Sequence, residues 1–187
     1  MLCNVIFSKE FLEDFNGISY IPEIHWLSNY DLELYTDSAG GSSKECAAIF
    51  ARKWVFMQWP AAWKNTPVLR DITYLELIPI ALAIYLWGHL LKNKKVIFFC
   101  DNEAVVFFLN NKSAKSERVM TLLRFVVYWT LKSNIQLKAK HIFSSFNKIA
   151  DYISRVQVEQ FRKLAPSAYR CPCRIPVEFL SLCGRSK

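Results

Sequence analysis

Fifteen consecutive residues, Leu77–Leu91, include no Lys, Arg, Asp or Glu. A helix needs roughly 20 apolar residues to cross a bilayer, and this stretch also contains Pro79 and His89. A helix that is apolar on every side is instead buried in a protein core. The stretch therefore predicts a helix packed on a sheet, and it predicts no membrane partner.

We expect this helix to run from Thr73 to about Leu91. Thr73 and Glu76 have the spacing of a capping box, in which each side chain bonds the backbone of the other residue. Pro79 has no N–H to donate to residue 75. The sequence therefore predicts either a bend at Pro79 or a later start of the helix.

The segments around this helix alternate between strand and helix patterns. Strands are expected at 32–36, 47–52, 54–59, 96–100 and 135–139, with a turn at 37–41, and helices at 102–110, 117–131 and 147–164. Three strands in a meander, followed by alternating helices and strands, indicate an α/β fold. We expect a mixed five-stranded sheet with helices on both faces.

The domain organisation follows from the same pattern. Residues 1–30, with a helix at about Lys9–Phe15, are expected to be a lead-in, and residues 31–164 form the predicted domain. Residues 165–187, which contain Pro166, Pro172 and Pro176, have the composition of a linker. Hydrophobic residues make up 52% of the chain, which excludes a disordered protein.

The charge of the chain is concentrated in its second half. The net charge is +8, but residues 1–110 contain nine Lys or Arg and twelve Asp or Glu, whereas residues 111–187 contain fifteen and four. A basic half indicates either a polyanionic partner such as nucleic acid or a solvated surface. The six cysteines form no CxxC pair, so we expect free thiols in an intracellular, reducing compartment, cytoplasm or nucleus.

Four acidic residues stand at the ends of the predicted elements. Asp37 and Asp101 follow strands, and Glu76 and Asp151 lie in the first turns of helices. Open α/β sheets form their sites where strands end and helices begin. Each acid alone also has a structural explanation: Asp37 as a turn residue, Glu76 in the capping box, Asp101 as an N-cap and Asp151 against a helix dipole. Together they favour a divalent metal site, because hard cations prefer carboxylate oxygens.

The motifs around these acids resemble the ribonuclease H domain of retrotransposon reverse transcriptases. They are Tyr35–Gly41, Tyr74–Leu77 around Glu76, Cys100–Asn102 and Asn147–Arg155, with spacings of 39, 25 and 50 residues between successive acids. The resemblance covers about residues 27–166. Trp87-Gly88 and Phe161–Pro166 are most similar to the DIRS-like, tyrosine-recombinase elements.

This resemblance implies a five-stranded sheet in the order 3-2-1-4-5 and cleavage of the RNA strand of an RNA–DNA hybrid. It implies that Asp37, Glu76, Asp101 and Asp151 bind two Mg²⁺, with Mn²⁺ as a substitute, and that His141 assists turnover. A reverse transcriptase domain in the parent polyprotein is the implied partner. The chain shows no polymerase or recombinase motifs, so we expect a fragment, a degraded copy or one piece of a polyprotein.

The histidine loop departs from the family pattern. The family's loop often reads His-x-Pro-Gly, whereas this chain has His141-Ile-Phe-Ser144. His141 could equally be an ordinary histidine at a strand end. An inactive hybrid-binding or packing domain is the alternative function, although such domains usually lack one of the acids. A strand transferase of the integrase type is disfavoured, because Glu76 comes second in the order of the acids.

Overall fold

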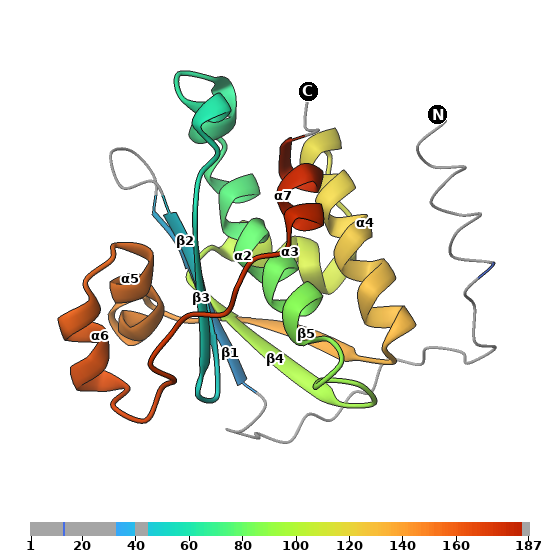
Figure 1. Cartoon of the computed structure of the whole chain (residues 1–187). Coiled ribbons are helices and arrows are strands. Elements are labelled where there is room, and N and C mark those ends of the chain that lie inside the picture. The colour runs from blue at the N-terminus through green and yellow to red at the C-terminus, as the bar shows by residue number, and fades with distance from the viewer. Residues whose placement is uncertain (1–12, 14–32, 40–44, 185–187) are drawn as a thin grey trace.

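The computed structural model describes residue 13 and residues 33–39 and 45–184. Five strands form one sheet in the order β3-β2-β1-β4-β5 (Figure 1). The first three pair antiparallel, and β1, β4 and β5 pair parallel. The strands are β1 (Glu33–Ser38), β2 (Glu45–Phe50), β3 (Lys53–Gln58), β4 (Lys95–Cys100) and β5 (Gln136–His141).

Helices cover both faces of this sheet (Figure 1). One face carries α2 (Ile72–Trp87), α3 (Glu103–Asn111), α4 (Glu117–Lys132) and α7 (Val177–Gly184), and the other carries α5 (Lys148–Ser154) and α6 (Val158–Leu164). Alternate residues of β2 therefore enter two different cores, with Ala48 in the larger and Ala47 in the smaller. The strand order and the helical layers confirm the ribonuclease H-like α/β fold that the resemblance implied.

Helix α2 is the buried helix that the apolar stretch predicts, with every residue from Tyr74 to Ile84 buried. The predicted capping box is wrong, because the Asp71 side chain accepts a hydrogen bond from Tyr74 N at 3.0 Å and so caps the helix two residues earlier. Pro79 lies inside the helix, which begins at Ile72 despite it. No helix among the described residues has the length and apolar character needed to span a membrane.

The first strand and the last helix differ from their predicted bounds. β1 continues to Ser38, so that Asp37 is a strand residue paired with Ala47. The predicted helix 147–164 is two helices, because Val156 has a φ of 56°. Two backbone hydrogen bonds, Val156 N to Ile153 O and Gln157 N to Tyr152 O, close the end of α5 and hold this left-handed conformation.

The predicted linker after residue 164 packs on the domain in the structure. Tyr169 N donates a hydrogen bond to Arg52 O, directly before β3, and Cys173 N donates one to Trp54 O within β3, each at 2.8 Å. The chain then crosses to the opposite face, where Phe179 of α7 is fully buried against Tyr85. The predicted lead-in at 1–30, with its helix, lies outside the described residues apart from Glu13, which is helical.

Candidate active site

Parallel pairing brings the ends of β1 and β4 to the same edge of the sheet. Asp37 is the penultimate residue of β1, and Asp101 follows the last residue of β4. Glu76 lies on α2, which packs across β1 and β2, and Asp151 lies on α5 on the opposite face. The four predicted acids thus come from four elements that surround one edge of the sheet.

Asp37 is buried, with 6% of its surface exposed. Ser154 Oγ donates a hydrogen bond to Asp37 Oδ2 at 2.5 Å. Burial raises the pKa of Asp37 from 3.8 to about 6; the Ser154 bond opposes the rise, and the charges of Asp101 and Asp151 add to it. The ionised form of Asp37 is therefore destabilised in the metal-free protein.

Glu76 is the most deeply buried of the four acids. It is 5% exposed, and its Oε2 has no hydrogen-bond partner among the described residues. Burial, followed by the charges of Asp37 and Asp101, raises the pKa of Glu76 well above its usual value. Potential ligand atoms of Glu76, Cys100 and Asp101 all lie within 4.8 Å of one another. A cation between them would compensate the buried negative charge.

Asp101 is held by the segment that follows β5. Ser144 Oγ, at the start of a short 3₁₀ helix, donates to Asp101 Oδ2 at 2.8 Å. His141 is exposed, and its Nε2 lies 3.2 Å from the backbone oxygen of Asp101. The loop that departs from the family pattern therefore still contacts Asp101, through Ser144 and His141.

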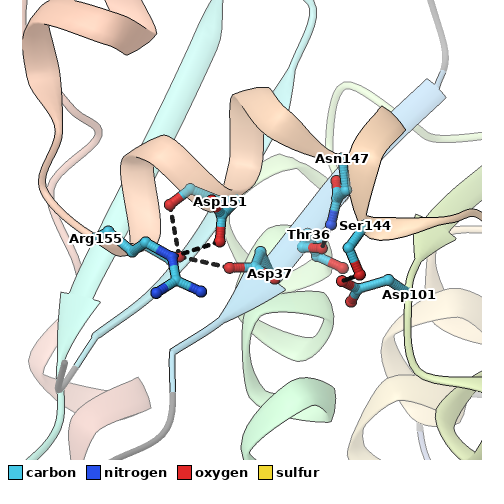
Figure 2. Close-up of polar contacts among 8 residues, drawn as sticks. Thr36, Asp37, Asp101, Ser144, Asn147, Asp151 and Arg155 are labelled. Atoms are coloured by element: carbon cyan, nitrogen blue, oxygen red, sulfur yellow. Dashed lines mark hydrogen bonds and ion pairs between the residues drawn. The ribbon is translucent and has the colours of Figure 1, made fainter. Parts of the chain in front are cut away.

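Asp151 forms the outer side of the cluster. Its Oδ1 accepts a hydrogen bond from Arg155 Nε at 2.6 Å, one turn later on α5, and the Asp151 side chain is 34% exposed. Figure 2 shows Asp37 between the Asp151–Arg155 pair on one side and Asp101 with Ser144 on the other. Asp151 is absent from the 4.8 Å group, and so is Asp37, but the charge of Asp151 adds to the raised pKa of Asp37.

The position of α5 is fixed by a buried amide. Asn147 is 1% exposed, and its Nδ2 donates to Thr36 O at 2.9 Å, next to Asp37 in β1 (Figure 2). This bond and the Ser154–Asp37 bond join both ends of α5 to β1. Two bonds a helix length apart determine how α5 presents Asp151 to the other acids.

Three side chains that orient the site have no role in the sequence-based prediction. Asn147, Ser154 and Arg155 lie four residues before, three after and four after Asp151, and such spacings place side chains on one helix face. That pattern could have identified all three as neighbours of Asp151. No comparable signal marks Ser144, because it reaches Asp101 across 43 positions of the chain.

Cys100 is a neighbour of the cluster to which the sequence pattern gives no role. Its thiol is buried, and Asn102 N donates to Cys100 Sγ at 3.4 Å. Burial, with the charge of Glu76, raises the pKa of Cys100 above its ordinary value. The thiol therefore remains protonated at neutral pH, and a protonated thiol is a poor metal ligand.

The comparisons with known proteins concern the second half of the domain. A family model described as reverse transcriptase-like matches residues 86–156. The matched residues include Asp101, His141 and Asp151, and they leave out Asp37 and Glu76. No curated protein matches the sequence. Together with the strand order, the family match supports an RNase H-like domain in this chain.

Proposed function

We propose that this chain is a metal-dependent ribonuclease H, an endonuclease that hydrolyses the RNA strand of an RNA–DNA hybrid. The observation that carries the proposal is the acidic cluster on an RNase H-like fold. Asp37 and Glu76 are buried carboxyl groups with raised pKa values, and both interact electrostatically with Asp101. A protein core retains such groups at a cost in stability, and a functional site is the usual reason.

The donor set fits a hard divalent cation. Glu76 Oε2 is buried without a partner among the described residues, and the pKa values of Asp37 and Glu76 are raised by burial. Both observations indicate carboxylate oxygens that lack a compensating positive charge. Mg²⁺ prefers such oxygens, and Mn²⁺ accepts them. When bound, two such ions would lower the pKa of a water and stabilise the leaving 3′ oxygen.

Each side chain then has a separate task. Asp37, Glu76, Asp101 and Asp151 would hold the ions, whereas Ser154 and Ser144 orient the carboxylates of Asp37 and Asp101 by direct hydrogen bonds. Residues that orient metal ligands affect metal affinity almost as strongly as the ligands do. We assign His141, which is exposed beside Asp101, an accessory role in turnover.

The substrate assignment rests on charge and on the fold. The balance of fifteen basic and four acidic residues after position 110 favours binding to the phosphates of a nucleic acid. An RNA–DNA hybrid is the substrate that the RNase H-like fold suggests, and the reverse transcriptase-like match suggests a parent polyprotein that also contains a polymerase. Origin in a DIRS-like retrotransposon is part of this proposal.

The test is cleavage of a labelled RNA–DNA hybrid by the full chain with Mg²⁺ or Mn²⁺. We expect cleavage of the RNA strand by the wild type and a loss of at least a hundredfold in Asp101→Asn. Glu103→Gln removes one charge from an exposed residue two positions away and is the matched control. Failure of the wild type to cleave, or equal cleavage by Asp101→Asn, would contradict the proposal.

One contact favours a second candidate, a domain that binds hybrids without cleaving them. Arg155 Nε lies 2.6 Å from Asp151 Oδ1 and so competes with a metal ion for that carboxylate. An exposed ion pair of this kind contributes only about 0 to 1 kcal/mol, which a bound cation can exceed. Tight binding of the hybrid in EDTA, without cleavage in either metal, would support this candidate.

A further inference from the structure

A cavity of about 450 Å³ opens beside the acidic cluster. It lies between the ends of β2 and β3, the segment that follows β3, and the end of α5. Ser154 lines this cavity and also donates a hydrogen bond to Asp37, so the cavity and the cluster share a wall. The lining residues on which the argument rests are Glu45, Gln58, Trp59, Lys64, Arg155 and Val156.

One wall of the cavity holds an amide with a fixed orientation. Glu45 and Gln58 face each other across β2 and β3, and Gln58 Nε2 donates to Glu45 Oε1 at 2.8 Å. Glu45 is 8% exposed, and its Oε2 has no partner within the described part of the chain. A carboxylate only accepts hydrogen bonds, so the NH₂ group of Gln58 must face Glu45. The carbonyl oxygen of Gln58, an exposed residue, is thus the end of the amide left for a ligand.

Two cationic side chains border the same cavity. Lys64 is exposed. Arg155 uses its Nε for Asp151, and its terminal nitrogens point away from both aspartates in Figure 2. These groups would attract an anion such as a phosphate. Trp59 and Val156 contribute the apolar part of the lining, against which the carbon atoms of a sugar would pack.

We propose that this cavity is a subsite for one ribonucleotide of the RNA strand, next to the phosphate that is cut. Its 2′-hydroxyl would donate to the carbonyl oxygen of Gln58, and its phosphate would lie near Lys64 and Arg155. Glu45 is a positioning residue that acts through Gln58. This inference rests on the proposed function, because it assigns the cavity to the same substrate. A deoxyribonucleotide lacks the hydroxyl, so the subsite selects RNA over DNA at one position.

The first experiment moves a single 2′-deoxy or 2′-fluoro nucleotide along the RNA strand of a hybrid. Neither group donates a hydrogen bond. With the full wild-type chain we expect cleavage to slow by about three- to tenfold, the value of one neutral hydrogen bond, at one fixed distance from the cut. In Gln58→Leu, cleavage of the all-ribose hybrid should be slower by that factor. Cleavage by this variant should no longer depend on the 2′ substituent at that position. Gln160→Leu, an exposed glutamine on α6, should behave as the wild type.

A second variant keeps the test independent of how Gln58→Leu folds. A neutral methylphosphonate at the subsite should weaken hybrid binding by the wild type more than by Lys64→Gln, because the lysine and the phosphate charge interact only when both are present, whereas Arg155 remains in the variant. Lys92→Gln, an exposed lysine before β4, should retain the full penalty. An equal penalty in Lys64→Gln and the wild type would overturn the subsite.

Fluorescence anisotropy measures binding of the same substituted hybrids in EDTA, where no metal-dependent cleavage takes place. This measurement distinguishes the subsite from the nuclease activity. Binding that depends on the 2′-hydroxyl through Gln58, without cleavage in either metal, would support the subsite and reject the nuclease. Cleavage with no position sensitive to the 2′ substituent, or with sensitivity that survives in Gln58→Leu, would reject the subsite and leave the nuclease standing.

Discussion

Ser154 Oγ donates a hydrogen bond to Asp37 Oδ2 at 2.5 Å and so joins the last turn of α5 to β1 across 117 positions of the chain. This contact joins the central strand to the helix that covers one face of the sheet, because Asp37 belongs to β1 and Ser154 to α5. The same serine lines the cavity beside the cluster. Changes at Ser154 therefore affect the acid and the cavity wall together.

Stability of the metal-free protein should depend on the protonation of Asp37. Its pKa rises from 3.8 to about 6 on folding, so the folded state binds the proton more tightly than the unfolded state does. The resulting stabilisation is complete below about pH 4 and is lost as the pH rises through about 6. At pH 8, Asp37→Asn should raise the free energy of unfolding by roughly 2 to 3 kcal/mol.

Urea unfolding in EDTA at pH 4 and pH 8 measures this difference. Near pH 4, where most of the wild-type Asp37 is protonated, the two proteins should differ little. If Asp37→Asn and the wild type have the same free energy of unfolding at pH 8, the buried carboxylate is stabilised by something other than metal.

Divalent cations should stabilise the fold through the same acids. A ligand that binds only the folded state adds about 2.7 kcal/mol at a concentration one hundred times its dissociation constant. At pH 8 we expect Mg²⁺ and Mn²⁺ to raise the thermal midpoint of the wild type and to have little effect on Glu76→Gln, which lacks the buried carboxylate. Differential scanning fluorimetry with a metal titration gives both values. Glu103→Gln should respond as the wild type, and an equal response in Glu76→Gln would place the bound metal elsewhere.

Removal of the Ser154 hydroxyl should shift the pH dependence of metal binding. The Ser154 hydrogen bond lowers the pKa of Asp37, so Ser154→Ala should raise that pKa above about 6 and move the pH dependence of metal binding upward. The variant should also lose about 1 kcal/mol of stability. Calorimetric titration of Mg²⁺ between pH 5 and 9 measures the shift. Ser154→Thr keeps the hydroxyl and should restore the wild-type profile, whereas a profile that is unchanged in Ser154→Ala would argue against this role.

The C-terminal helix should contribute to the stability of the domain. Phe179 is 1% exposed and contacts the rings of Tyr85 and Phe125. Truncation of a buried phenylalanine costs about 3 to 5 kcal/mol, so Phe179→Ala should unfold at a markedly lower urea concentration. Leu180→Ala, at a position 38% exposed, should cost far less. Equal midpoints for the two variants would mean that α7 does not contribute to the core.

Strands and helices with a strong local pattern were predictable from the sequence. The charge-free stretch at 77–91 predicts the buried helix α2, and the Asp101-Asn102 pair predicts the start of α3, where Asn102 accepts a hydrogen bond from Val105 N at 3.2 Å. The break at Val156 was not predictable, because a β-branched residue disfavours positive φ and tertiary contacts override that preference. The packed segment at 169–179 was also missed, since its prolines indicate a linker.

The candidate site was predictable only in part. Four acids at element ends indicate a cluster, but a sequence does not give the distances between them. In the structure Glu76 and Asp101 contribute to one 4.8 Å group, whereas Asp151 is paired with Arg155 at 2.6 Å. Helical spacing places Ser154 near Asp151, but its bond to Asp37 spans 117 positions and the bond from Ser144 to Asp101 spans 43, and such long-range contacts leave no periodic signal in the chain.

The hydrogen bonds from Tyr169 N to Arg52 O and from Cys173 N to Trp54 O cover the start of β3. β3 is the outermost strand on its side of the sheet, and an outermost strand with unpaired backbone groups is a template for strand addition by another molecule. In this protein the segment 169–173 pairs with the start of that strand from within the same chain. A protein shortened before Tyr169 would leave the start of β3 unpaired, and strand addition between molecules would then favour self-association.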